Sequence, residues 1–108
     1  MYVLVYITTS DAKEAEHIGE NIVKQKLAAC ANIIKDISSI YWWKGKLEKE
    51  GEALLLLKTS EKNVEKVIDA VRKMHSYENP AVVAIPILKG SKDYLSWIDE
   101  VLYDEKAG

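Results

Sequence analysis

The chain has 108 residues, 48% hydrophobic and 30% charged, with a formal net charge of -2 at pH 7. This length and composition predict one globular domain, residues 1–108, and exclude a disordered chain. The negative charge and the single arginine, Arg72, argue against binding to nucleic acid or an anionic membrane. With one cysteine, Cys30, and no signal-peptide pattern after Met1, we expect a protein of the reducing cytoplasm.

The first part of the chain predicts a strand, a helix and a second strand. Residues 2–7 form a short apolar run that is typical of a central strand. Asp11, followed by a glutamate three residues later, predicts the start of a helix over residues 11–27. A strand follows over residues 30–43, with a bend expected at Asp36.

Residues 39–60 form the predicted centre of the fold, a long β-hairpin with an aromatic first arm and an aliphatic second arm. The charged segment from Gly45 to Gly51 is predicted to form its turn and to expose the glutamates around it to solvent. Neither arm alternates polar and apolar residues, so both faces of the hairpin need to be covered. One small domain struggles to cover two faces, which favours self-association.

The second part of the chain predicts a helix, an edge strand and a last helix. Ser60 is a typical helix start, and the helix must end near His75 because Pro80 disfavours helical geometry just before it. Residues 81–87 read as a strand, and Pro86 places it at a sheet edge because proline donates no hydrogen bond. Ser91 caps a final amphipathic helix, and residues 103–108 are expected to be loose.

This order predicts an α+β fold, the ferredoxin-like split βαβ sandwich, with an extra C-terminal helix. In this plan the first and third strands are central, and right-handed crossovers put both main helices on one face of the sheet. The edge strand that carries Tyr41, Trp42 and Trp43 has no inward charge or proline to block pairing with another chain. We therefore expect these aromatic residues to form an interface between copies of the chain.

The densest polar cluster lies at the end of the second predicted helix and includes His75 and Glu78. His75 is a candidate ligand for Cu²⁺ or Zn²⁺, with Glu78 as a second ligand. Alternatively, His75 hydrogen-bonds the last carbonyl groups of the helix. Cys30 reads as a soft metal ligand or a buried small hydrophobe, and His17 lies on a charged, solvated helix face.

Sequence motifs for catalysis are missing. There is no nucleophile elbow and no glycine-rich phosphate loop, and no pair of His or Cys residues has zinc-ligand spacing. We therefore expect a protein that is not an enzyme and has no obligatory cofactor. A small-molecule enzyme that uses His75 and Glu78 as acid and base remains a further hypothesis.

Six stretches along nearly the whole chain resemble the CutA family of divalent-cation tolerance proteins. They are residues 27–32 (LAACAN), 41–46 (YWWKGK), 58–59 (KT), 75–80 (HSYENP), 86–87 (PI) and 94–98 (YLSWI). The resemblance implies a ferredoxin-like subunit, similar in fold to PII signalling proteins, that assembles as a tight homotrimer through long hairpin strands. It also implies binding of copper or another divalent metal ion.

The resemblance further implies where ligands would bind. Family members credited with a copper site use a cysteine at the end of the first strand and paired histidines at the end of the second helix. Here Ile7 and Thr8 occupy the first region, and Met74 precedes His75. The expected cleft between subunits is lined by Trp43, Lys58, His75, Tyr77, Glu78 and Trp97.

Two functions follow from these features. The leading hypothesis is a cytoplasmic homotrimer involved in divalent-cation tolerance, which binds a divalent metal ion or a small ligand in clefts between subunits. The alternative is a structural or adaptor trimer that acts through a protein partner and binds metal incidentally.

Overall fold

A computed structural model describes residues 1–103 of the chain. Along this part, β1 (Tyr2–Thr9), α1 (Ala12–Lys24), β2 (Cys30–Trp43), β3 (Lys46–Ser60), a 3₁₀ turn (Glu61–Asn63), α2 (Val64–Met74), β4 (Val82–Pro86) and α3 (Lys92–Tyr103) follow one another. The predicted order and the α+β split βαβ architecture with an extra C-terminal helix are confirmed. The predicted loose tail began at Tyr103, but this residue is the last of α3; the rest of that tail, residues 104–108, lies outside the described residues.

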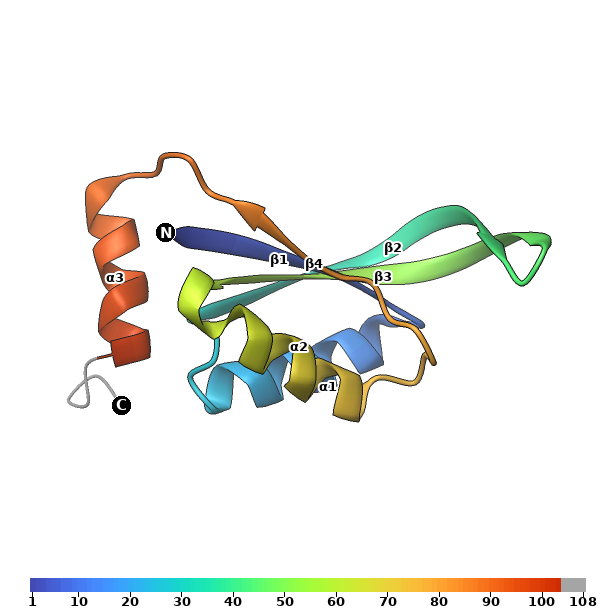
Figure 1. The fold of residues 1–108 in the computed structure, drawn as a ribbon, viewed down its shortest axis with the longest axis horizontal. Helices are drawn as coiled ribbons and strands as arrows, with labels where there is room; N and C mark the ends of the chain where they lie inside the picture. Colours follow the sequence, from blue (N-terminus) through green and yellow to red (C-terminus); the bar gives the residue numbers. More distant parts are fainter. Residues whose placement is uncertain (104–108) are drawn as a thin grey trace.

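The four strands form one antiparallel sheet in the order β2-β3-β1-β4. The first and third strands are therefore central and the second and fourth are edges, as predicted. Pro86 pairs with Val3 at the outer edge of the sheet. Figure 1 shows α1 and α2 together on one face of the sheet, while α3 stands across the end of the sheet that holds the N-terminus.

The hydrophobic core lies between the sheet and the two main helices. Alternate residues of β1 and β3 are buried there, including Val5, Ile7, Leu55 and Leu57. A Cβ atom at Gly19 of α1 would lie 3.0 Å from a methyl carbon of Leu55, so glycine permits the close approach of this helix to β3. The apolar residues on the opposite sheet face are only half-buried or exposed, as expected for a face that the helices do not cover.

The hairpin turn is shorter than predicted. Lys44 and Gly45 alone connect β2 to β3, with φ values of 49° and 80°, and Trp43 pairs directly with Lys46. Two residues with positive φ suit a tight hairpin because their twist matches that of the flanking strands. The prediction that Gly45–Gly51 forms the turn is wrong, because Gly51 lies within β3 opposite Ser38.

The β2–β3 hairpin continues beyond the rest of the sheet (Figure 1). β1 pairs with β3 only from Ala53 to Ser60, so the first seven residues of β3 pair with β2 alone. The register of β2 shifts between Ile34 and Ile37, which confirms the bend expected at Asp36. Beyond the end of β1, β3 therefore has no neighbouring strand on that side, and Glu52 is the first β3 residue without a partner in β1.

The helix ends differ slightly from the prediction. The Asp11 carboxylate accepts a hydrogen bond from the Glu14 backbone N–H at 2.8 Å, so the predicted N-cap is confirmed. α1 ends at Lys24 instead of residue 27, because Lys26 adopts a left-handed φ of 57°. α2 ends before His75, as predicted from Pro80.

Candidate functional site

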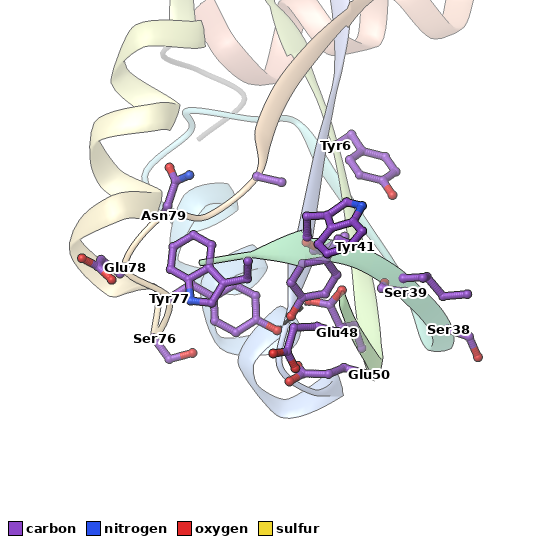
Figure 2. Close-up of a pocket in the computed structure, with 16 residues that line it drawn as sticks. Tyr6, Ser38, Ser39, Tyr41, Glu48, Glu50, Ser76, Tyr77, Glu78 and Asn79 are labelled. Atoms are coloured by element: carbon purple, nitrogen blue, oxygen red, sulfur yellow. Dashed lines mark hydrogen bonds between the residues drawn. The ribbon is translucent and has the colours of Figure 1, made fainter. Parts of the chain in front are cut away.

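A groove of about 930 Å³ lies where β1 ends and the hairpin continues (Figure 2). Its walls come from four segments of the chain. They are Tyr6 and Thr8 of β1, residues 38–43 of β2, Glu48, Glu50 and Glu52 of β3, and residues 76–79 and 81 of the loop after α2. This volume is in the range of pockets that hold small organic ligands.

Glu52 forms part of the groove wall together with Tyr77. The Tyr77 hydroxyl donates a 2.5 Å hydrogen bond to Glu52 Oε2, and Glu52 is only 6% exposed. Burial raises the pKa of the Tyr77 phenol well above its usual value, and the hydrogen bond to Glu52 and its negative charge raise it further. The pair thus joins the loop after α2 to the middle of β3.

The negative charges of three glutamates act on the Tyr41 phenol. Desolvation raises the pKa of the Tyr41 phenol, and the charges of Glu50, Glu52 and Glu48 add to the increase. Nearby negative charges oppose formation of a phenolate. In Figure 2 the carboxylates of Glu48 and Glu50 lie beside the ring of Tyr41.

His75 anchors the loop that forms one wall of the groove. It is 9% exposed, and its Nε2 lies 2.8 Å from the Thr8 carbonyl oxygen while its Nδ1 accepts the Tyr77 backbone N–H at 3.0 Å. A carbonyl oxygen can only accept, so Nε2 carries the proton and the ring is the neutral Nε2–H tautomer. Both ring nitrogens are occupied, which leaves no lone pair for a metal ion in this arrangement.

The alternative prediction was that the His75 side chain binds the last carbonyl groups of its own helix. This prediction is wrong. Its ring binds the carbonyl of Thr8 at the end of β1, 67 positions away in the sequence. Glu14 supports the same loop, because its Oε2 accepts the Ser76 N–H at 2.8 Å and lies 3.9 Å from His75 Nδ1. Burial alone would raise the pKa of Glu14, but hydrogen bonds from Ser10 and Ser76 outweigh it and lower the pKa.

Glu78, the second predicted metal ligand, has a different partner. Its Oε2 lies 3.6 Å from the Lys44 ammonium, and both side chains are exposed. The same ammonium lies 5.4 Å from the ring centre of Trp43, at the hairpin turn. His75 thus binds backbone groups of Thr8 and Tyr77, whereas Glu78 lies next to Lys44. The two side chains do not share a position where both could bind one ion.

Two predicted cleft residues belong to a second cluster, in which Lys58 of β3 lies next to Tyr94 and Trp97 of α3. The Lys58 ammonium donates to Tyr94 Oη at 3.1 Å and lies 5.2 Å from the centre of the same ring. This hydrogen bond to Tyr94 raises the pKa of Lys58. The rings of Tyr94 and Trp97 are 5.5 Å apart.

The predicted cleft residues are therefore divided between two places in one chain. Trp43 and Tyr77 line the groove, whereas Lys58 and Trp97 belong to the cluster at α3. Lys46, the cross-strand partner of Trp43, is twelve residues from Lys58, or roughly 40 Å along an extended strand. One subunit cannot bring these two groups together.

The predicted interface residues Tyr41, Trp42 and Trp43 all line the groove. Trp42 is 73% exposed and faces Leu47 across the hairpin. A single chain does not test whether another copy covers them, so the interface assignment stays a prediction.

Sequence reasoning missed the acidic wall of the groove. Glu48, Glu50 and Glu52 were expected in a solvated turn, but they occupy alternate positions of β3 and all three line the groove. The Lys44-Gly45 pair after Trp43 could have indicated the true position of the turn, because a glycine in a two-residue loop is typical of tight hairpins. With the turn placed there, the three glutamates fall within β3.

Metal-ligating side chains do not form a cluster in the described part of the chain. Across residues 1–103, no three His, Cys, Asp or Glu side chains are grouped so that they could hold one metal ion. Structural zinc sites use four protein ligands and catalytic ones usually three. A complete site of either kind would need a grouping of ligands that residues 1–103 do not form. In the same residues, no helix is long and apolar enough to cross a membrane.

Comparison with known sequences identifies the family. Residues 3–101 match the model of the CutA1 divalent ion tolerance protein family. The divalent-cation tolerance protein CutA of Archaeoglobus fulgidus is 43% identical over 102 residues, which cover 94% of this chain and 99% of that protein. Human protein CutA is 41% identical over 96 residues, which cover 89% of this chain but only 54% of the human protein.

Solved structures agree with the sequence matches. The structure described as the periplasmic divalent cation tolerance protein CutA from Archaeoglobus fulgidus has a TM-score of 0.92 at 43% identity and covers 94% of this chain and 99% of its own. CutA1 from Oryza sativa has a TM-score of 0.91 at 35% identity and covers 96% and 95%. The sequence and fold matches thus extend over nearly the whole chain, and this chain belongs to the CutA1 family of divalent ion tolerance proteins.

Proposed function

We propose that this protein acts in divalent-cation tolerance as a homotrimer that binds a divalent metal ion, copper or zinc, or a small ligand in clefts between subunits. The printed name of the Archaeoglobus relative supports the cation-tolerance role. The observation that carries the assembly is the unpaired edge of β2, the long outer strand of the hairpin. We further propose that the protein is not an enzyme.

The hairpin needs support that one chain does not supply. Residues 46–52 of β3 pair only with β2, and an isolated two-stranded ribbon is at best marginally stable in water. The outer strand also carries exposed apolar side chains, with Ile40 at 67% and Trp42 at 73%. An exposed apolar edge strand is a template for pairing with another chain. Pairing between copies would cover both the edge and these side chains.

The open face of the sheet supports the same assembly. On β4, Val83 and Ile85 are exposed at 52% and 43%, and on β3 Leu54 and Leu56 are only half-buried. These residues are continuous across the sheet because Tyr6 pairs with both Val83 and Leu56. Burial of apolar area contributes about 25 cal/mol per Å², so a second subunit on this face would stabilise the protein.

A cleft between subunits also explains why the resemblance groups residues that one chain separates. The groove end with Trp43 and Tyr77 and the α3 end with Lys58 and Trp97 would meet only if they came from different copies. The metal ion is proposed to bind in such a cleft, with Glu78 as a candidate ligand because its carboxylate is exposed. His75 could bind metal only after it loses the hydrogen bond from the Tyr77 N–H.

Native mass spectrometry tests this proposal directly. The protein is measured after treatment with a chelator and again after Cu²⁺ or Zn²⁺ is added back. We expect a trimer that takes up a fixed number of ions per subunit. A stable monomer would contradict the assembly, and a trimer without stoichiometric uptake would contradict the metal site.

A structural or adaptor trimer is the second candidate function. The observation that favours it is that both nitrogens of His75 are already occupied inside one subunit. If the protein is an adaptor, the same experiment should show an intact trimer with weak, non-stoichiometric metal uptake.

The cytoplasmic location is also a proposal, and cell fractionation would test it against the periplasmic description of the Archaeoglobus protein.

A further inference from the structure

The C-terminal helix α3 has little apolar contact with the rest of the chain. Among its 12 residues only Ile98 is buried, and within residues 1–103 no α3 residue belongs to the main hydrophobic core. By comparison, α1 buries Ala15, Ile18, Gly19 and Ile22. A segment with few buried apolar side chains opens at a lower free energy than the core does. We therefore expect α3 to open more readily than α1.

Polar contacts attach α3 to the sheet instead. Within residues 1–103, three side-chain hydrogen bonds join this helix to β1 or β3, and each involves a tyrosine hydroxyl. They are Tyr2 to Asp99 Oδ2 at 2.5 Å, Lys58 to Tyr94 Oη at 3.1 Å, and Ser60 with Tyr103. The first two are exposed, so water can replace either partner when they break. Opening of α3 would therefore leave neither of these two pairs buried without a partner.

The attachment lies at one end of the sheet, on the face that α1 and α2 leave open. Tyr2 and Ser60 are cross-strand partners. They alternate along their strands with the core-facing residues Val3 and Thr59, which are both buried, so they point to the other face. Figure 1 shows α3 across this end of the sheet.

The segment between β4 and α3 is suited to act as a hinge. The Ile87 N–H still donates to the Tyr2 carbonyl oxygen at 2.9 Å, which ties the start of this segment to the sheet. Residues 88–91 are all exposed, with Leu88 at 88%. In Figure 1 they form a loop outside the sheet that leads into α3. Short loop segments of this kind absorb the backbone rotation of hinge motions.

Opening of α3 would change the cluster of Lys58, Tyr94 and Trp97. In the closed position Tyr94 Oη accepts a hydrogen bond from the Lys58 ammonium, and the Tyr94 ring lies 5.5 Å from that of Trp97. Within residues 1–103, no carboxylate oxygen lies within 4.0 Å of the Lys58 ammonium. Both rings belong to α3 and Lys58 belongs to β3, so movement of the helix separates them. The position of α3 thus decides whether this ammonium group is held or free.

We propose that α3 is a hinged gate at the Lys58 end of the cleft. It opens as a unit about residues 88–91, while the sheet, α1 and α2 stay folded, and it releases the Lys58 ammonium from Tyr94. The closed helix withholds this ammonium from a negatively charged group of a small ligand. This inference deepens the proposed function and rests on it for the role of the cleft, whereas the opening itself needs only the contacts of one chain.

Hydrogen exchange followed by mass spectrometry, on the full-length protein in its native assembly, tests the opening. A helix amide exchanges only after its hydrogen bond breaks, so its rate reports how often that helix opens. We expect the slowest amides of α3 to exchange at least about tenfold faster than the slowest amides of α1.

Two variants remove the same attachment from opposite sides. Tyr2→Phe removes the donor and Asp99→Ala the acceptor, and each should speed exchange in α3 about tenfold and leave α1 unchanged. The double variant should add little to either single one, because both remove one bond. Asp69→Ala on the exposed surface of α2 is the matched control and should not affect α3. Alanine favours the helix at both positions, so faster exchange in Asp99→Ala cannot come from a lower helix propensity.

Lysine acetylation tests whether the helix acts as a gate. The native assembly is treated with an N-hydroxysuccinimide ester of acetic acid, and the acetylated peptides are quantified by mass spectrometry. Tyr2→Phe should raise the acetylation rate of Lys58 about tenfold, in step with exchange in α3. Lys66 on the exposed surface of α2 should react at the same rate in both proteins.

Three outcomes would overturn the proposal. The first is equal exchange of α3 and α1 in the wild type, which would show that α3 does not open separately, whether its own chain or another copy holds it. The second is equal acceleration of both helices in Tyr2→Phe, or equal effects of Asp99→Ala and Asp69→Ala, which would indicate a general loss of stability. The third is unchanged acetylation of Lys58 while α3 exchanges faster. Trimer formation and metal uptake are read separately by native mass spectrometry, so failure of the gate is distinguishable from failure of the proposed function.

Discussion

Tyr77 donates a 2.5 Å hydrogen bond to Glu52, and this bond joins the loop after α2 to β3 at the point where β1 ends. Within residues 1–103, the Tyr77 phenol is the one hydrogen-bond donor to the Glu52 carboxylate, which is almost fully buried. The loop position is fixed from its other side by His75, whose ring binds the end of β1. These two contacts hold the wall of the groove, and both can be tested by substitution.

Tyr77→Phe should destabilise the protein by about 1–3 kcal/mol, because it leaves the buried Glu52 carboxylate without its donor. Chemical denaturation followed by circular dichroism measures this change. A double-mutant cycle with Glu52→Gln should show coupling between the two positions. The matched cycle of Tyr77→Phe with Glu48→Gln should show little coupling, and equal coupling in both cycles would contradict the assigned hydrogen bond.

Stability should fall at alkaline pH because of the same tyrosine. The folded-state pKa of Tyr77 is raised above its ordinary value of 10.0, so the native protein holds this proton more tightly than the unfolded chain does. The stabilisation is complete below about pH 10 and is lost as pH rises toward the folded-state pKa. Denaturation midpoints between pH 8 and pH 11, roughly the range around the ordinary tyrosine pKa, should decline less steeply in Tyr77→Phe than in the wild type. Parallel curves would refute the assignment.

His75→Ala should destabilise the protein by about 2–3 kcal/mol, because the Thr8 carbonyl and the Tyr77 N–H both lose a buried partner. Thermal unfolding measures the loss. His17→Ala, on the exposed face of α1, is the control and should change stability by less than about 0.5 kcal/mol.

The same His75→Ala variant also tests the predicted metal site. Both ring nitrogens are used inside the subunit, so we expect the affinity for Cu²⁺ to stay within a factor of about three of the wild-type value, or less than 1 kcal/mol. A much larger loss of affinity, with the trimer intact, would show that the ring turns to bind metal.

Trp42→Asp should break the proposed trimer without unfolding the subunit. Trp42 is largely exposed in the single chain, so the substitution removes little intramolecular packing, but it places a charge on the edge strand. Sedimentation velocity should show a smaller species. Lys66→Asp on the exposed surface of α2 is the control, and persistence of the trimer in Trp42→Asp would rule out this interface.

The main elements of the fold could be predicted because their signals are local. The Asp11 cap, the apolar spacing of α1, the restriction before Pro80 and the missing donor of Pro86 each act within a few residues. The strand order followed from connectivity and handedness. The turn was misplaced because Gly45 and Gly51 carry similar local signals, and only the register of β2 on β3 distinguishes them.

The candidate site depended on contacts that local sequence does not encode. Glu52 and Tyr77 are 25 positions apart, and Thr8 and His75 are 67 positions apart. The chain by itself determined which residues form strands and helices and which faces are apolar, because periodicity and capping are properties of neighbouring residues. Only the tertiary structure decided that Glu52 is buried and that His75 has no free nitrogen, because both depend on where β1 ends beside the longer hairpin.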